Sequence, residues 1–269
     1  MVKVAVLIPH YNNIQGLEKS LSSISALEPI DVVIVDDGSK TRPNLADLKS
    51  NFRHVNNFSI INIEKNMGIE YALNEGLSFI EKSQKYEYIA RLDCGDICHP
   101  ERFKIQREFL DKNSDIYLVG SWVSFVDTDG KELFPVKYPL KHKTLKKKMY
   151  FNNMFIHPSV MFRTSAIDKV GYYPTDIKNA EDYAYFFKFV KFFETANIDK
   201  ILVKVELNPE GISISKRKLQ IRNRIRIILQ NWEWDVYCVY GLSRNVLIYF
   251  LPYFVVEKMK MFLSRIFKG

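Results

Sequence analysis

Short apolar runs alternate with amphipathic segments over the first 91 residues, and this alternation restricts the fold more than any other feature of the chain. The apolar runs, rich in β-branched residues, fall at 2–8, 30–37, 58–64 and 86–92. The segments 14–27 and 68–82 place their apolar residues at helical spacing. Because the runs lack polar alternation, they predict parallel strands covered on both faces, as in a βαβ sheet.

The pattern changes after residue 101. The sequence predicts a helix at 102–110, a strand at 116–126 and a tight turn at 127–131. A further strand is predicted within 159–171 and a buried helix at 181–193. No internal repeat or low-complexity linker interrupts the chain. We therefore predict a catalytic domain at 1–215 and a helical extension at 216–269.

Composition excludes several classes of protein. With 47% hydrophobic and 26% charged residues, the chain has the composition of a globular protein and not of a disordered one. The start has no signal-peptide pattern, because its first apolar run leads directly into Pro9 and polar residues. Cys94, Cys98 and Cys238 form neither a paired framework nor a zinc spacing. These observations predict a cytoplasmic protein with reduced thiols.

The positive charge is concentrated at the end of the chain. Residues 216–269 hold eleven Lys and Arg against three acids, which accounts for the whole net charge of +8. The apolar stretch 246–256 is too short to span a bilayer. The pattern favours a helix that lies on an anionic membrane at the inner face of the cell membrane. The alternative is that these helices pack on the domain or on a second copy of the chain.

Four groups of polar residues each follow a predicted strand, and they are 9–13, 36–39, 66–68 and 91–96. Ligands of open α/β sheets bind beyond the carboxyl ends of the strands, so we expect these groups to converge on one cleft. Each group also has a purely structural interpretation. Residues 36–39 can form a strand-ending turn, while Asn66 and the acids Asp93 and Asp96 can cap helices.

Six motifs resemble the family 2 glycosyltransferases, which have the GT-A fold, in order and approximate spacing. The motifs are LIPHYNN, VIVDDGS, NMGIEYALNEGL, ARLDCGD, PERFKIQ and AEDYAYFFK. The resemblance covers about residues 1–215. It implies a mostly parallel, Rossmann-like mixed sheet and transfer of a sugar from a nucleotide-diphosphate donor to a hydroxyl group, with inversion and usually with a divalent cation.

The resemblance also assigns roles to individual residues. Pro9 and Tyr11 stand where the family holds the nucleotide base, and Asp37 matches the carboxylate that accepts a hydrogen bond from it. Asn66 and Arg91 match positions beside the diphosphate, where a helix N-terminus and a guanidinium favour negative charge. Together these residues imply a UDP-sugar donor.

The metal motif departs from the family pattern. Most relatives read Asp-x-Asp-Asp, and Gly95 replaces the second aspartate, the usual metal ligand, between Asp93 and Asp96. The two remaining acids are the candidate ligands for Mn²⁺ or Mg²⁺, together with phosphate oxygens and water. Alternatively, Arg91 or His157 replaces part of the cation's charge. His157 can equally be a structural histidine.

The resemblance places the catalytic base at Asp182, because inverting transfer needs a carboxylate that takes the proton of the acceptor hydroxyl. Glu181 can orient the acceptor, or both acids can simply favour the start of a helix. Lys141 and the run 146–148 are expected on a solvated face, and the alternative is that they contact an anionic lipid-linked acceptor.

Three other functions compete with the interpretation as a glycosyltransferase. A nucleic-acid-binding protein would explain the basic tail, but acidic strand ends repel phosphate. A dehydrogenase would show a G-x-G-x-x-G motif after the first strand, and none is present. Loss of the metal ligand also fits a sugar-nucleotide binder without catalysis. We favour a hexosyltransferase that acts on a glycan or polyprenyl-linked acceptor in O-antigen or capsule synthesis, with no nucleic-acid partner.

Overall fold

The structure, a computed structural model, describes residues 2–207 and 216–251. The described strands are β1 (Val4–His10), β2 (Ile30–Asp37), β3 (Asn57–Ile63), β4 (Tyr88–Arg91), β5 (Ile97–Cys98), β6 (Ile116–Val126), β7 (Glu132–Val136), β8 (Met161–Arg163) and β9 (Glu194–Glu206). The described α-helices are α1 (Ile14–Ser22), α2 (Leu45–Asn51), α3 (Ile69–Ser83), α4 (Arg102–Lys112), α5 (His142–Met149), α6 (Ile167–Val170), α7 (Glu181–Phe192), α9 (Arg217–Gln230) and α10 (Val236–Phe250). Two short 3₁₀ turns, His157–Ser159 and Thr164–Ala166, flank β8.

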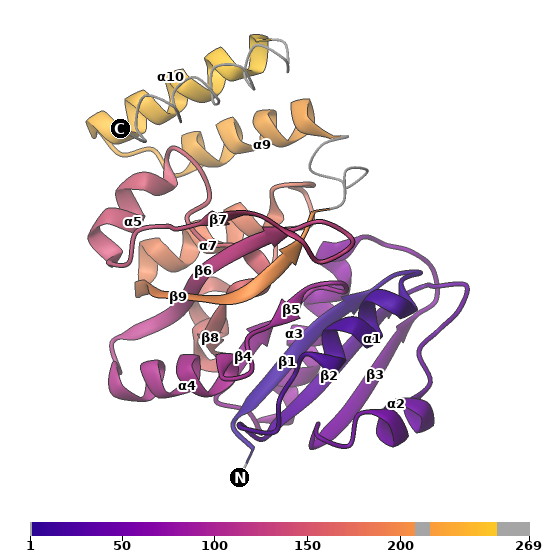
Figure 1. The fold of residues 1–269 in the computed structure, drawn as a ribbon. Coiled ribbons are helices and arrows are strands. Elements are labelled where there is room, and N and C mark those ends of the chain that lie inside the picture. Colours follow the sequence, from indigo (N-terminus) through magenta and orange to yellow (C-terminus); the bar gives the residue numbers. More distant parts are fainter. Residues whose placement is uncertain (1, 208–215, 252–269) are drawn as a thin grey trace.

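The described strands form one mixed sheet in the order β3-β2-β1-β4-β8-β6-β9-β5, with β7 paired to β6 (Figure 1). In the first half, β1 pairs in parallel with β2 and β4, and β2 pairs in parallel with β3. The predicted βαβ arrangement of this half is therefore confirmed. The carboxyl ends of these parallel strands meet at one edge, which is where the polar groups of the sequence follow them.

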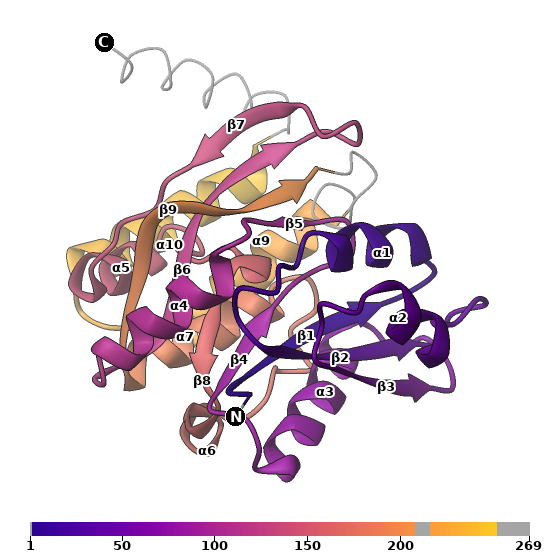
Figure 2. The same ribbon diagram turned by 60° about the horizontal axis from the view of Figure 1, so that its bottom comes forward.

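Each of these central strands is covered on both faces. Val4 and Val6 contribute to a core with α1, α2 and α4, while Ala5 and Leu7 contribute to a second core with α3 and α7. Figure 2 shows α1 and α2 on one side of the N-terminal strands and α3 on the other. Burial on both faces explains why the sequence of β1 is an unbroken apolar run.

The second half of the sheet adds antiparallel pairs. β8 pairs antiparallel with both β4 and β6, and β5 pairs antiparallel with β9. β6 begins and ends as predicted, whereas β9, its parallel neighbour, was not predicted as a strand. These strands carry the chain back to the edge where the first half presents its polar groups.

The described part of the C-terminal extension forms two helices that lie beside each other (Figure 1). Ile227 and Cys238 are buried in the core that α5 and α7 share. Gly241 brings α10 so close to the backbone of Tyr150 that an added Cβ would lie 2.3 Å from its carbonyl oxygen. The helices thus pack on the domain through one face, and the expectation for 252–269 lies outside the described residues.

Candidate functional site

The loops that follow β1 and β2 are joined by a hydrogen-bonded network. The buried His10 pairs through Nδ1 with Asp36 Oδ1 at 2.7 Å, and the second oxygen of Asp36 accepts from the Ser39 backbone N–H. Asn12 N–H donates to Ser39 Oγ at 2.8 Å, and the Asn12 side-chain oxygen accepts from the Lys40 backbone. This network fixes the two loops relative to each other, although the sequence suggested no separate role for His10 or Asp36.

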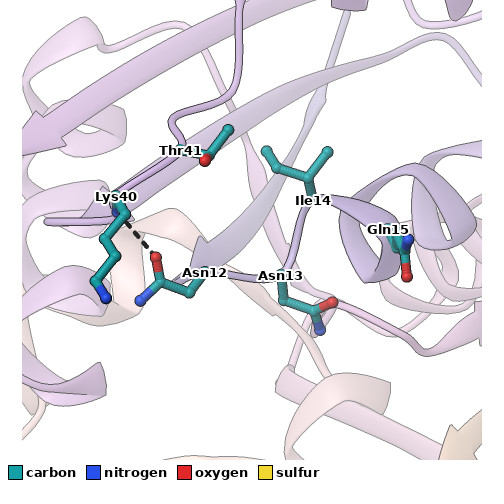
Figure 3. A pocket seen from close by; sticks show the side chains of 6 residues that line it. All are labelled: Asn12, Asn13, Ile14, Gln15, Lys40 and Thr41. Carbon is teal, nitrogen blue, oxygen red and sulfur yellow. Dashed lines mark hydrogen bonds between the residues drawn. The ribbon is translucent and has the colours of Figure 1, made fainter.

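A surface hollow of about 570 Å³ lies beside this network, as Figure 3 shows. Asn12, Asn13 and Gln15 line it from the start of α1, and Lys40 and Thr41 line it from the loop after β2. The acids and the buried arginine singled out from the sequence do not line it. The hollow is therefore adjacent to the predicted nucleotide-binding residues and separate from the acidic centre.

Asp37 connects the end of β2 to the loop before α3. Its two carboxylate oxygens accept hydrogen bonds from the backbone N–H groups of Met67 and Gly68, at 2.8 and 2.9 Å. Gly38 has φ +71°, and a Cβ there would lie 2.5 Å from the backbone carbon of Lys65. Only glycine lets the two loops approach so closely. Asp37 is 4% exposed, and these two backbone hydrogen bonds leave two lone-pair positions of its carboxylate unused.

Arg91 is fully buried and holds three groups together. Its guanidinium donates to the carbonyl oxygen of Leu7 and to Asp93 Oδ1, and its Nε lies 3.4 Å from His157 Nε2. Burial, together with the Arg91 charge, lowers the pKa of His157 well below its usual range. His157 is therefore neutral at pH 7 and, through Nε2, also contacts the hydroxyl of Tyr173 at 2.9 Å.

The Asp93–Asp96 loop rests on α1. The backbone N–H of Gly95 donates to Gly16 O and to Ser20 Oγ, both at 3.0 Å, and Ser20 Oγ donates to Asp93 O. The side chains of the two acids then diverge. Asp93 faces a cavity, whereas Asp96 is 4% exposed and accepts a hydrogen bond from the Glu206 backbone N–H at the end of β9.

The cavity that Asp93 faces gathers residues from five separate segments. Its volume is about 450 Å³. It is lined by Asn66, Met67, Gly68, Ile69, Glu70, Asp93, His157, Lys178, Asn179, Glu181, Asp182 and Gln220. Five residues singled out from the sequence thus converge here: Asn66, Asp93, His157, Glu181 and Asp182.

The other sequence-predicted residues lie around this cavity and do not line it. Asp37 holds its wall at Met67 and Gly68, and Arg91 holds Asp93. Pro9 lies in β1, and Tyr11 follows it with a side chain that is 50% exposed. The side chain of Asp96 points toward β9.

Asp182 lies in the first turn of α7, with both carboxylate oxygens hydrogen-bonded. Oδ2 accepts from the side-chain amide of Asn153 at 2.9 Å, and Oδ1 accepts from the Tyr183 backbone N–H at 2.7 Å. Burial raises the pKa of Asp182, and the hydrogen bond from Tyr183, the charge of Arg224 and the hydrogen bond from Asn153 act against that rise. A half-buried, oriented carboxylate with a raised pKa has the properties of a general base.

Glu181 has a different environment from its neighbour. Burial, and then the carboxylate of Asp182, raises the pKa of Glu181 to about 8, so that it holds a proton at neutral pH. Its buried Oε2 has no hydrogen-bond partner among the described residues, and neither has Oε1 of Glu70 on the same cavity. The first turn of α7 therefore carries one hydrogen-bonded acid, Asp182, and one protonated neighbour, Glu181.

Four residues of the site were missed by reasoning from sequence. Asn153, Lys178 and Gln220 belong to no motif, because they reach the cavity only through the packing of the chain. Glu70 lies within a motif, but an acid in the first turn of a helix is usually explained by the helix dipole.

The residues present do not fit the two-carboxylate metal site that the resemblance implies. Gly95 has no side chain, and Asp96 faces away from the cavity. Among residues 2–207 and 216–251, no cluster of three or more His, Cys, Asp or Glu has the arrangement of a metal site. Asp93 is the one acid of this loop that lines the cavity.

The sequence is similar to known transferases. Residues 5–171 match the sequence model of "Glycosyl transferase family 2". The chain is 27% identical over 228 residues to the amylovoran biosynthesis glycosyltransferase AmsE of Erwinia amylovora, covering 83% of each chain. It is 32% identical over 200 residues to the UDP-Gal:alpha-D-GlcNAc-diphosphoundecaprenol beta-1,3-galactosyltransferase of Escherichia coli, covering 72% of this chain and 70% of the relative.

The fold is similar to solved structures of transferases. S. aureus TarS 1–349 in complex with UDP-GlcNAc aligns with a TM-score of 0.63 at 19% identity, covering 91% of this chain and 71% of that one. A longer S. aureus TarS structure aligns with a TM-score of 0.64 at 18% identity, and the chain covers 43% of its length. A mannosyltransferase from Pyrobaculum calidifontis in complex with GDP-Man and Mn²⁺ aligns with a TM-score of 0.61 at 14% identity, covering 90% of this chain and 68% of that one.

The likeness to these structures confirms the predicted mixed α/β fold, and the match over residues 5–171 confirms the resemblance of the motifs. The chain therefore belongs to glycosyl transferase family 2 and is a glycosyltransferase with the GT-A fold.

Proposed function

We propose that the enzyme transfers a sugar from a UDP-sugar, with inversion at the anomeric carbon, to a hydroxyl of a glycan or polyprenyl-linked acceptor in O-antigen or capsule synthesis. The observation that carries the proposal is the convergence of Asn66, Asp93 and Asp182, which lie far apart in sequence, on one cavity. The names of the relatives support a uridine nucleotide, because one uses UDP-Gal and another structure holds UDP-GlcNAc.

In the proposed reaction, the acceptor oxygen forms a bond to the anomeric carbon while the bond from that carbon to the diphosphate breaks. The electron pair of the broken bond leaves with the β-phosphate oxygen, which gives UDP, and Asp182 takes the acceptor's proton. Asn153 orients Asp182 through its amide, and Glu181 holds its own proton beside it. Because Glu181 is neutral, the site avoids two adjacent negative charges.

The uracil end of the donor is assigned to the loops after β1 and β2. Tyr11 is half exposed and offers its ring for stacking beside Pro9. Asp37 keeps free lone pairs after its two backbone hydrogen bonds, so it can accept from the imide N–H of uracil. The buried hydrogen bond between His10 and Asp36 fixes the loops after β1 and β2 relative to each other.

The donor assignment is tested by measuring the melting temperature of the protein with UDP, GDP and CDP, because a ligand that binds only the folded state stabilises it. At 100 times the dissociation constant, UDP is expected to add about 2.7 kcal/mol to the free energy of unfolding. At the same concentration, GDP and CDP are each expected to add less than half of that free energy of unfolding. Equal stabilisation by all three nucleotides would remove the role of Asp37. UDP release with acceptor present separates transfer from mere binding.

We further propose that the outer face of the C-terminal helices lies on an anionic membrane at its cytoplasmic side. Exposed apolar side chains form a stripe at helical spacing on α10, made of Val236, Val239, Tyr240, Leu247 and Phe250, and the exposed Trp234 lies just before the helix. Trp234 is 93% exposed and Phe250 is 76% exposed. Seven Lys and Arg against two acids in 216–251 favour an anionic surface. In the described part of the chain, no helix has the length and apolar character to cross a bilayer.

Vesicle binding tests this surface. Replacing Phe250 with Ser is expected to weaken co-sedimentation with phosphatidylglycerol vesicles by roughly tenfold, because about 1.5–3 kcal/mol of apolar burial is lost. The matched control is Leu27→Ser, since Leu27 is also exposed but follows α1. Equal binding of both variants would contradict the assignment. Concentration-dependent dimerisation that Phe250→Ser abolishes would instead assign the stripe to a second copy of the chain.

A further inference from the structure

Gly95 stands where the family pattern has its metal-binding aspartate, and the backbone of the Asp93–Asp96 loop has a conformation there that suits glycine. Gly95 has φ +106°, a backbone conformation that other residues rarely adopt. A Cβ at Gly95 would point at the carboxylate of Glu206, with its nearest atoms at 3.6 Å. Glu206 is held in place by an ion pair with Lys19 at 2.6 Å. An acidic side chain at position 95 would therefore meet both backbone strain and a like charge.

The two remaining acids of the loop are already engaged. The carboxylate of Asp96 is buried and accepts a hydrogen bond from the Glu206 backbone N–H at 2.9 Å, which directs it away from the cavity. Asp93 faces the cavity but forms a 2.5 Å ion pair with the buried Arg91. A metal ion would have to compete with that guanidinium for the single acid that remains.

The cavity nevertheless needs positive charge to hold a diphosphate. Four of the described residues that line it are acids: Glu70, Asp93, Glu181 and Asp182. Arg91 pairs with Asp93, and the charge of Arg224, which does not line the cavity, acts on Asp182. Lys178 is the only Lys or Arg among the described residues that line the cavity. Among the described residues, no carboxylate oxygen lies within 4.0 Å of the Lys178 ammonium nitrogen.

The backbone that carries Lys178 is fixed against α9. The side-chain amide of Asn223 donates to the Lys178 carbonyl oxygen at 2.7 Å. The next residue, Asn179, has φ +60°, a left-handed conformation that turns the chain toward α7. Asp176, just before this turn, pairs with Arg226 of the same helix at 2.6 Å. Lys178 is thus an exposed cation on an anchored loop at the cavity wall, without an ion-pair partner among residues 2–207 and 216–251.

We propose that the ammonium group of Lys178 forms an ion pair with the leaving diphosphate. It would do so in place of a divalent cation bound by the Asp93–Asp96 loop. This inference rests on the UDP-sugar function proposed above. A lysine is a compact point charge that suits a phosphate group, and it acts most strongly on the charge that develops as the bond to the sugar breaks.

Calorimetric titration of UDP and UMP into the full chain tests the role of Lys178, because UMP lacks the β-phosphate. Lys178→Met is expected to weaken UDP binding by about tenfold and UMP binding by less than about threefold, as for loss of one charge-assisted contact to the second phosphate. Lys178→Arg is expected to restore most of the UDP affinity. The control Lys143→Met, on α5, is expected to leave both affinities unchanged. Equal losses for UDP and UMP would overturn the contact to the β-phosphate.

The same titrations with EDTA or with Mn²⁺ test the role of the metal. The expected UDP affinity of the wild-type chain differs by less than about threefold between the two conditions, because the loop supplies no free carboxylate. A rise of tenfold or more with Mn²⁺ that Asp93→Asn abolishes would assign a metal to the loop and overturn the inference. If UDP binds in neither condition, the proposed UDP-sugar function fails first, and the role of Lys178 fails with it.

Discussion

Replacing Asp182 with Asn is expected to lower the rate of sugar transfer by about 10²–10⁴-fold, because an amide cannot take the proton of the acceptor hydroxyl. The Asn side chain has the same shape, and it keeps an oxygen for the hydrogen bond from Asn153. The affinity for UDP is therefore expected to stay within about threefold of the wild-type value. The measurement is steady-state UDP release in the presence of acceptor.

The control for this substitution is Asp199→Asn, because Asp199 is an exposed acid of β9 that lies outside the cavity. It is expected to leave transfer unchanged. A wild-type rate in Asp182→Asn would remove Asp182 as the base. If Glu181→Gln then abolished transfer, the base would be the neighbouring acid, acting through the deprotonated fraction that its pKa of about 8 leaves at neutral pH.

Replacing Arg91 with Met is expected to lower the free energy of unfolding by about 3 kcal/mol, because it removes the buried cation of an ion pair whose Asp93 side chain is 33% exposed. Arg91 is fully buried, and its guanidinium is hydrogen-bonded to Leu7 O as well as to Asp93. Methionine fills much of the same volume but satisfies neither oxygen. Urea denaturation of the two proteins measures the difference.

A matched surface substitution, Arg53→Met, is expected to change the free energy of unfolding by less than about 0.5 kcal/mol, because Arg53 is exposed. A loss below about 1 kcal/mol in Arg91→Met would show that Asp93 and Leu7 O find other partners. In that case Asp93 would also be free to take part in ligand binding.

Three strands of the first half, β1, β2 and β4, were predictable because they are buried on both faces. The sequences of β1, β2 and β4 are continuous apolar segments, and such segments are typical of parallel strands. The helix α3 was predictable from its apolar face, where Leu73, Leu77 and Ile80 all became buried.

The strand β9 was not predictable in the same way. It follows α7 with no glycine or proline between them, and residues 199–201 are exposed in its middle. Its pairing with β6 shifts register at Ser121 and Trp122, so the apolar pattern is broken. The orientation of Asp96 depends on this strand, because Glu206 at its end supplies the hydrogen bond. The sequence therefore could not show which acid of the loop faces the cavity.

The site itself was predictable only in part. The rule that ligands bind at the carboxyl ends of strands led to Asn66 and Asp93, and both line the cavity. Lys178 and Gln220 reach it from a connection and from α9, and their positions follow from tertiary packing. No local pattern in the sequence marks such residues.

A crystal structure of the protein with UDP tests the central claim most directly. The expected result places the diphosphate in the cavity between Asp93 and Lys178, with uracil on Tyr11 and Asp37, and leaves Asp182 facing the position of the sugar that is transferred. UDP bound on another face of the molecule, or with its diphosphate turned away from this cavity, would contradict the proposed site.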